Sequence, residues 1–313
     1  MSELFSIFLN FIIILSGLLW LFFRVNSIIK KKIKKSSLIL KKNDSFFKIN
    51  YLSSFSSVFP LLITVFLVRS FLYEPFQIPS GSMIPSLLVG DFILVKKFSY
   101  RLINPINQST IFKIKDPKRG DIVVFRYPMN KKMNFVKRII GIPGDKIIYD
   151  PERKELKIFP NYLKNSQKNC IPIEYSLKKE SEWVLFTDDV FFRNQQSHHK
   201  ISVYDQIPKN SLRQEERVER IDRKKSYTIL LTPGTYVESY YKQKFMSKNQ
   251  WIIPKKNYFV MGDNRDNSSD SRNWGTITED DLIGEVTMIW FSLNKVEHQW
   301  PNGIRLKRIG KIC

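Results

Sequence analysis

Two long apolar stretches open the chain, and a different pattern follows them. Leu4–Phe23 holds 20 residues without a charge, and Phe55–Tyr73 carries one charge, Arg69, near its end. A helix crosses the apolar core of a bilayer with about 20 residues, so both stretches predict transmembrane helices, at residues 1–23 and 55–73. The first stretch is longer than the apolar part of a cleavable signal peptide, and the residues before it carry no positive charge. We therefore expect it to be kept as an anchor.

From Phe76 onward, short apolar runs alternate with turns that contain Gly, Pro and Asp. Runs of this length between turn residues are typical of β-strands, and no long amphipathic pattern competes with them. The sequence therefore predicts a mainly β, antiparallel domain built from residues 74–149 and 254–313. Its expected strands are Asp91–Val95, Gly120–Phe125, Asn134–Ile140, Lys146–Tyr149, Tyr258–Met261 and Glu285–Phe291.

Residues 150–253 differ in composition from the segments on either side. They are charged and loop-rich, as in Arg213–Lys225, and only Trp183–Phe186 and Tyr227–Leu231 give strand signals. We interpret this segment as a smaller β-rich subdomain inserted into the first domain. The two cysteines, Cys170 and Cys313, are too far apart in sequence to define a disulfide framework.

The net charge of the chain is +22, and positive charge is densest between the two apolar stretches. Residues 24–50 hold nine Lys and Arg against one Asp, which gives this short segment a charge of +8. Short loops rich in Lys and Arg stay in the cytoplasm, so residues 24–54 are expected there, with the N-terminus and everything after Tyr73 on the other side. The other positive charges are spread along the chain without a recognition motif, so no nucleic-acid partner is expected.

The segment Pro79–Pro85 (PSGSMIP) lies shortly after the second apolar stretch. Prolines fix the backbone angle φ and remove hydrogen-bond donors, so we expect a stiff, extended turn that is neither helix nor central strand. Gly81 lets another chain approach the backbone closely. The turn either presents Ser80 and Ser82 for chemistry just outside the membrane or simply joins the anchor to the domain, and the motif alone is compatible with both.

Lys137 and Arg138 stand side by side in an otherwise apolar run. Neighbouring side chains of a strand point to opposite faces, so one of these cations must face inward or into a cleft. Burial lowers the pKa of a lysine, and a lysine that is neutral near pH 7 can act as general base toward a serine hydroxyl. Surface positions are expected for the three histidines, His198, His199 and His298.

The segment Gly262–Gly275 (GDNRDNSSDSRNWG) concentrates Asp, Arg, Asn and Ser side chains. A calcium loop of the EF-hand type needs glycine at its sixth position and glutamate at its twelfth, but counting from Asp266 these positions hold Ser271 and Ile277. No metal is therefore expected. The alternatives are a hydrogen-bonded wall that orients a catalytic group and an ordinary polar turn.

Four motifs, FQIPSGSMIPSLLVGDFILV, GDIVVF, FVKRIIGIPGD and GDNRDNSSDSRNWG, occur in this order after the two apolar stretches. Together they resemble bacterial signal peptidase I (leader peptidase) in its two-span Gram-negative form, over roughly residues 74–149 and 254–293. The resemblance implies a Ser-Lys endopeptidase that removes N-terminal signal peptides from secreted and membrane-translocated precursors. It also implies a place in the bacterial inner membrane, with the catalytic domain on the periplasmic side.

The resemblance also implies roles for single residues. Ser82 corresponds to the nucleophile and Lys137 to the general base. The Ser82 backbone N–H and the Ser80 hydroxyl correspond to the oxyanion hole, and Ser268 to the hydroxyl that holds the lysine amine in place.

Two further sets of residues are implied. The supporting ion pair corresponds to Asp270 and Arg272, with Arg138 as a further partner. The walls of shallow pockets, which accept the small side chains before a cleavage site, correspond to Phe76, Ile78, Leu87 and Val136.

The expected partners are precursors that carry signal peptides, together with membrane lipids, and no cofactor is expected. One alternative is a membrane-tethered Ser-Lys protease of the self-cleaving repressor type, but that type lacks the spans and the last motif. Another is an anchored, non-enzymatic module that binds anionic lipid or nucleic acid through its basic surface. It leaves the four ordered motifs unexplained.

Overall fold

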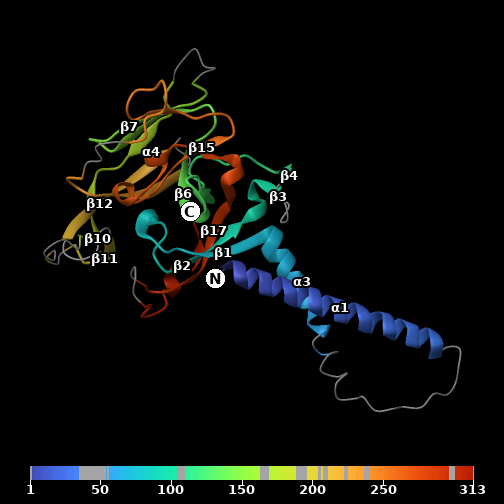
Figure 1. Cartoon of the computed structure of the whole chain (residues 1–313). Coiled ribbons are helices and arrows are strands. Elements are labelled where there is room, and N and C mark those ends of the chain that lie inside the picture. The colour runs from blue at the N-terminus through green and yellow to red at the C-terminus, as the bar shows by residue number, and fades with distance from the viewer. Residues whose placement is uncertain are drawn as a thin grey trace. The chain divides into compact units, whose positions relative to one another are not determined.

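The computed structural model describes residues 2–34, 54, 56–103, 110–162, 169–187, 196–203, 206, 211–221, 225–235, 240–295 and 300–312. These residues fall into two compact units, Met1–Leu72 and Tyr73–Cys313. The first unit is helical and the second consists mainly of antiparallel sheets (Figure 1).

The N-terminal unit contains a long helix, α1 (Ser2–Lys34), and a shorter one, α3 (Phe59–Leu67), which a π-helical turn extends through Val68–Leu72. Within the described residues, one helical stretch, Phe11–Ile29, is long and apolar enough to cross a membrane. Helix α1 continues beyond Phe23, where the predicted span ends, because Lys and Arg are good helix formers and no Gly or Pro interrupts the chain between Phe23 and Lys34. The predicted second span corresponds to α3 and its π-helical extension.

The larger unit is built on an eight-stranded sheet whose strands are all antiparallel (Figure 1). Its order is β1-β2-β17-β5-β6-β15-β16, and β18 pairs with β17. The bounds are β1 (Tyr73–Gln77), β2 (Asp91–Lys96), β5 (Ile122–Tyr127), β6 (Asn130–Gly141), β15 (Asn257–Met261), β16 (Ile277–Thr278), β17 (Leu282–Ser292) and β18 (Gly310–Lys311). Strand β17, late in the sequence, therefore joins two pairs of early strands.

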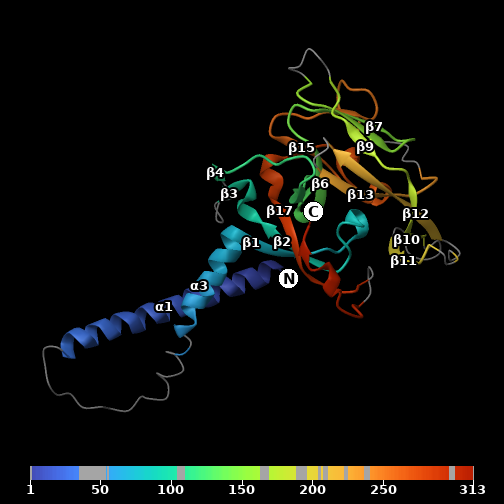
Figure 2. The same cartoon turned by 180° about the vertical axis from the view of Figure 1, so that it is seen from behind.

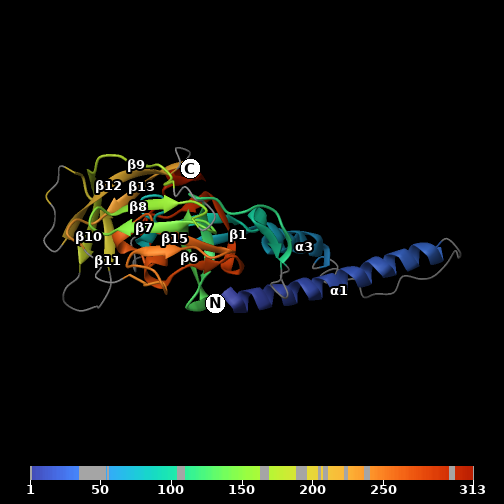
Figure 3. The ribbon, with the colours of Figure 1, turned by 90° about the horizontal axis from the view of Figure 1, so that it is seen from above.

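Three smaller sheets complete this unit (Figures 2 and 3). One has the order β14-β7-β8, a second has the order β11-β10-β12-β13 with β9 on β12, and a third pairs β3 with β4. The bounds are β3 (Arg101–Ile103), β4 (Thr110–Lys113), β7 (Lys146–Asp150), β8 (Glu155–Phe159), β9 (Ile173–Tyr175), β10 (Lys179–Thr187), β11 (Gln196–Lys200), β12 (Ser211–Ile221), β13 (Lys225–Leu231) and β14 (Gln250–Ile252).

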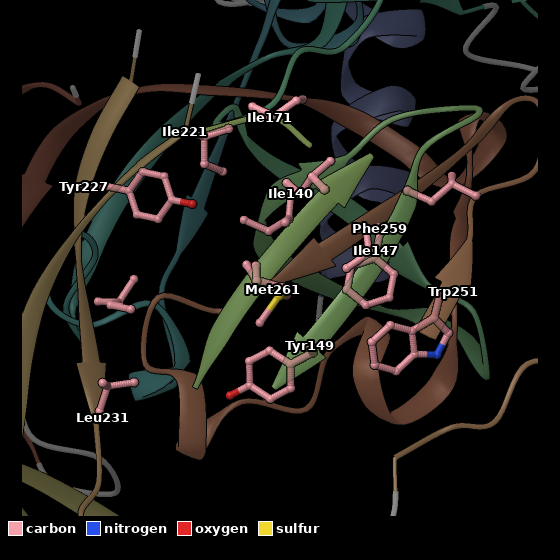
Figure 4. Packing of buried hydrophobic residues seen from close by; sticks show 14 residues of the cluster. Ile140, Ile147, Tyr149, Ile171, Ile221, Tyr227, Leu231, Trp251, Phe259 and Met261 are labelled. Atoms are coloured by element: carbon pink, nitrogen blue, oxygen red, sulfur yellow. The ribbon is translucent and has the colours of Figure 1, made fainter. Parts of the chain in front are cut away.

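A hydrophobic cluster joins the main sheet to strands of residues 150–253 (Figure 4). Phe259 and Met261 of β15 pack in it with Tyr149 of β7, Trp251 of β14 and Tyr227 of β13. The segment interpreted as an insertion thus shares a core with the sheet that it interrupts. Cys170 is a free, exposed thiol, and Cys313 lies outside the described residues.

The expectation of loops around Arg213–Lys225 was wrong. Strand β12 runs through Ser211–Ile221 and pairs with β9, β10 and β13. Its polar residues mislead because two of them are fully buried and paired: Gln214 donates to Asn264, and Glu219 forms an ion pair with Arg265 at 2.7 Å. A buried charge is tolerated when a partner and hydrogen bonds compensate it.

Candidate active site

The chain between β1 and β2 forms a loop that carries Ser82. The two strands hold its ends together, since Ile78 N donates to Asp91 O (2.8 Å) and Gly90 N donates to Ile78 O (3.0 Å). Ser82 itself lies in a 3-10 turn, Gly81–Met83, which closes when Ile84 N donates to Gly81 O (3.1 Å). The expectation of an extended turn that is not helical was wrong at these three residues.

Lys137 approaches this turn from β6. Its Nζ lies 2.5 Å from Ser82 Oγ, and the lysine side chain is buried, with 4% of the residue exposed. The turn and the strand are 55 residues apart in sequence, so the contact depends on the tertiary fold. Burial lowers the pKa of Lys137 from 10.5 to about 8, although Asp270 and Asp263 act in the opposite direction. Burial thus brings the pKa of this amine close to neutral pH, and a neutral amine at this distance can accept the proton of a hydroxyl.

Arg138, the next residue, is also buried but faces other groups. Its guanidinium donates to both carboxylate oxygens of Asp263 (2.8 and 2.6 Å) and to Gly120 O (2.9 Å), and it lies 3.9 Å from the centroid of the Tyr227 ring. The two adjacent cations therefore have different environments, as the alternation of a strand requires. The expected partnership of Arg138 with the Asp270 pair was wrong, because Asp263 takes its guanidinium in a bidentate ion pair.

Asp263 and Asn264 attach the serine loop to the sheet, and sequence reasoning did not single them out. Asp263 accepts a hydrogen bond from Ser86 Oγ (2.5 Å) while it pairs with Arg138 of β6. The backbone N–H of Asn264 donates to Ser82 O (3.1 Å), and its side-chain Nδ2 donates to Gly81 O (3.1 Å). One dipeptide thus binds the loop that carries the serine and the strand that carries the lysine.

Asp270 and Arg272 form a buried ion pair at 2.8 Å. Asp270 also caps the short helix α4 (Ser271–Trp274) and accepts a hydrogen bond from Gly262 N (3.0 Å). The guanidinium of Arg272 keeps the pKa of Asp270 below its usual range against the opposing effect of burial. Asp270 therefore remains ionised and is the charge that most strongly favours the protonated form of Lys137.

Ser268 lies beside the same backbone. A Cβ placed on Gly262 would meet the Ser268 hydroxyl and would lie 2.6 Å from Ser82 O, so only glycine fits between them. The Ser268 hydroxyl is buried and has no hydrogen-bond partner among the described residues. A role in holding the lysine amine stays a prediction.

The expected pocket residues belong to one apolar cluster. Phe76, Ile78, Leu87 and Val136 pack in it together with Met83, the neighbour of Ser82. Ile78 and Leu87 are buried, whereas Phe76 and Val136 are partly exposed. Exposed Ser80 precedes the turn in an extended conformation.

The expectation that His198 lies at the surface was wrong. The histidine, on β11, is 8% exposed and contacts the backbone of the serine loop at Gly81. No local signal marks it, since the contact depends on how two distant segments fold together. His199 is partly exposed and lies edge-on to Phe186, and His298 lies outside the described residues.

Comparison with known proteins places the chain in a family. The family described as signal peptidase, peptidase S26, matches residues 51–291 of the chain. The chain belongs to the S26 signal peptidases. Signal peptidase I of Buchnera aphidicola (subspecies Schizaphis graminum) is 44% identical over 328 residues, and the match covers 100% of both chains. Signal peptidase I of Haemophilus influenzae is 34% identical, with 98% of this S26 peptidase and 91% of that protein covered.

Proposed function

We propose that the chain is a membrane-anchored signal peptidase I that uses Ser82 as nucleophile and Lys137 as general base. Membership of the S26 family supports the activity itself, which is cleavage of signal peptides by a serine endopeptidase. The 2.5 Å separation of Lys137 Nζ and Ser82 Oγ carries the assignment of the two residues. A serine hydroxyl becomes a useful nucleophile only when a nearby base removes its proton, and among the described residues Lys137 is the titratable side chain that forms a hydrogen bond with it.

In the first half of the reaction, Ser82 Oγ attacks the carbonyl carbon of the scissile peptide bond while neutral Lys137 takes the hydroxyl proton. The carbon–nitrogen bond then breaks, and the protonated lysine delivers that proton to the leaving amine, which is the new N-terminus of the mature protein. In the second half, water attacks the acyl-enzyme ester. Lys137 takes a proton from the water and returns it to Ser82 Oγ, which releases the signal peptide as a carboxylic acid.

Three groups are proposed to assist these steps. The Ser82 backbone N–H and the Ser80 hydroxyl stabilise the developing oxyanion, a contribution of about 3 kcal/mol for one donor in comparable sites. Ser268, with its unpartnered hydroxyl, orients the lysine amine. The Asp270–Arg272 pair holds the backbone around Gly262 and sets the local charge.

The apolar cluster next to the turn supports the substrate class. Phe76 and Val136 are partly exposed members of the cluster, and Ile78 and Leu87 are buried members of it. We propose that these residues form the walls of shallow pockets for the small side chains that precede the cleavage site of signal peptides. The substrates are therefore precursors with small residues at and near the scissile bond.

We further propose a multi-pass location in the bacterial inner membrane. The helix over Phe11–Ile29 supports one anchor, and the apolar residues 55–73 form the second. Residues 24–54 then lie in the cytoplasm, and the N-terminus and the catalytic domain lie on the periplasmic side. A membrane-embedded substrate and enzyme meet by diffusion in two dimensions, which is the advantage of the anchor. Reporters fused near residues 35 and 200 should report opposite sides of the membrane.

The decisive experiment is cleavage of a secretory precursor by the full-length chain in membranes. Ser82→Ala and Lys137→Ala should each abolish cleavage, while Lys157→Ala, which changes an exposed lysine on β8, should retain it. Ser268→Ala should reduce the rate more than Ser269→Ala, because Ser269 is exposed. Full cleavage by Ser82→Ala would show that another nucleophile is used, and full cleavage by Lys137→Ala would remove the dyad.

A further inference from the structure

His198 is a buried histidine that contacts the backbone of the serine loop. It belongs to β11, in the segment 150–253, and is separated from Asn264 by 66 residues of sequence. Its Nε2 lies 2.9 Å from Asn264 Nδ2 and 3.0 Å from Asn267 Nδ2. The imidazole therefore faces two side-chain amides of the segment that holds the loop.

The neighbours of Asn264 fix the direction of these hydrogen bonds. Asn264 Oδ1 accepts from Gln214 Nε2 (2.9 Å), and Asn264 Nδ2 donates to Gly81 O (3.1 Å), so the amide nitrogen is the atom that faces His198. His198 Nε2 must then be an acceptor, and the ring proton must lie on Nδ1. Protonation of Nε2 would set an N–H against an amide donor, and burial lowers the pKa of His198 to about 4. The ring is neutral throughout the physiological range.

The other side of the ring packs against Gly81. A Cβ on Gly81 would lie 2.7 Å from His198 Nδ1 and 3.0 Å from its Cε1, so the absence of a side chain at residue 81 is what lets the ring fit. Nδ1 is buried without a hydrogen-bond partner among the described residues. An unpaired buried donor costs free energy, so the ring holds this position against a local penalty. An apolar side chain could fill the same space without leaving a buried donor unpaired, so packing alone does not explain a histidine at this position.

We propose that His198 is a positioning residue for the nucleophile. Its neutral ring braces Gly81 directly and orients the Asn264 amide, which in turn holds the carbonyl of Gly81 while the Asn264 backbone holds that of Ser82. These contacts keep Ser82 Oγ within reach of Lys137. The inference rests on the proposed roles of Ser82 and Lys137, and it gives a purpose to part of the segment 150–253.

The first test replaces His198 in the full-length, membrane-embedded enzyme and measures precursor cleavage. His198→Ala should lower kcat by ~10- to 100-fold, the usual scale for a misplaced reacting group, while KM changes less than about twofold. His198→Gln should recover much of kcat, because its Oε1 can accept from the two amides. His199→Ala is the matched control, since this neighbouring side chain faces Phe186, and should behave like the wild type.

A pH profile separates positioning from general loss of structure. If the loop loosens, water reaches Lys137, and the pKa of its amine rises from about 8 toward 10.5. The acid limb of kcat/KM should therefore move to higher pH in His198→Ala and return in His198→Gln. A variant that is merely unfolded in part would lose amplitude without this shift.

A double-mutant cycle tests the contact with Gly81. Gly81→Ala should be severely impaired in the presence of the ring, and adding His198→Ala should make room for the new methyl group. The loss in the double variant should thus be smaller than the product of the two single losses. Multiplicative losses, together with a His198→Ala enzyme that has wild-type kcat and pH profile, would overturn the inference.

The outcomes also separate this inference from the proposed function. If Ser82→Ala cleaves precursor, the proposed function fails whatever His198 does. If Ser82→Ala is inactive and the His198 variants match the wild type, only the positioning role fails. If His198→Ala does not accumulate as folded protein, the His198→Gln profile and the partial rescue of Gly81→Ala by His198→Gln decide the matter.

Discussion

The burial that lowers the pKa of Lys137 should also lower the free energy of unfolding at neutral pH. The pKa falls from 10.5 to about 8, and this difference corresponds to about 3 kcal/mol of folding free energy. Below pH 8 the lysine is protonated in the folded and in the unfolded chain, so the folded state carries the full cost of the buried charge. Between pH 8 and 10.5 the unfolded chain binds more protons, and stability rises with pH. Above 10.5 the amine is neutral in both states and the cost is gone.

Lys137→Met removes the charge but keeps a long, flexible side chain of similar length. The variant should therefore be more stable than the wild type at pH 7 by up to about 3 kcal/mol, or by roughly 6–12 °C in Tm for a domain of this size. The advantage should shrink as the pH rises from 8 to 10.5. The same variant should have no peptidase activity, since a thioether cannot take the proton of Ser82.

The assay is thermal unfolding of the full-length protein in detergent, followed by tryptophan fluorescence at pH 7 and at pH 10.5. Lys157→Met, at an exposed position of β8, controls for the general effect of a lysine-to-methionine change and should move Tm little at either pH. The reasoning is refuted if Lys137→Met lowers Tm at pH 7, or if its difference from the wild type is the same at both pH values. Confirmation would show that this peptidase gives up stability for a reactive amine.

Three further outcomes follow from the same site. For the wild type, kcat/KM should rise about tenfold per pH unit up to pH 8 and then level off, because only neutral Lys137 is a base; a limb centred near pH 6 would contradict this assignment. Asp263→Asn should lower the free energy of unfolding by about 3–5 kcal/mol in denaturant titrations, since it leaves a buried guanidinium unpaired, whereas Asp116→Asn, which is 73% exposed, should cost less than about 1 kcal/mol. Gly262→Ala should abolish cleavage with little change in precursor binding, because its methyl group would displace Ser82 O; wild-type kcat in this variant would contradict the close packing.

The sequence predicted the strands wherever apolar runs were bounded by turn residues. The runs at Asp91–Val95 and Tyr258–Met261 fall within β2 and β15, because most of β15 and every second residue of β2 are buried and the side chains of both runs are mostly apolar. The sequence also predicted that one cation of the pair Lys137-Arg138 faces inward, since the neighbouring residues of the strand are apolar. These features are local, and local pattern is what a single sequence reports.

The parts that sequence reasoning missed depend on contacts between distant segments. Strand β12 contains buried Gln214 and Glu219, which look like surface residues until Asn264 and Arg265 are placed beside them. The partner of Arg138 was misassigned for the same reason, because three aspartates stand close together in sequence and only the fold selects Asp263. His198 had no distinguishing neighbours in its own strand.

The place of β17 in the main sheet has a consequence for biosynthesis. The serine loop belongs to the β1–β2 hairpin and the lysine to the β5–β6 hairpin, and β17 is the strand that pairs with both β2 and β5. A ribosome completes the two hairpins long before it reaches Leu282–Ser292. The two hairpins that carry the serine and the lysine should therefore emerge before the strand that pairs with both of them, and proteolytic competence should appear only after Leu282–Ser292 has been translated.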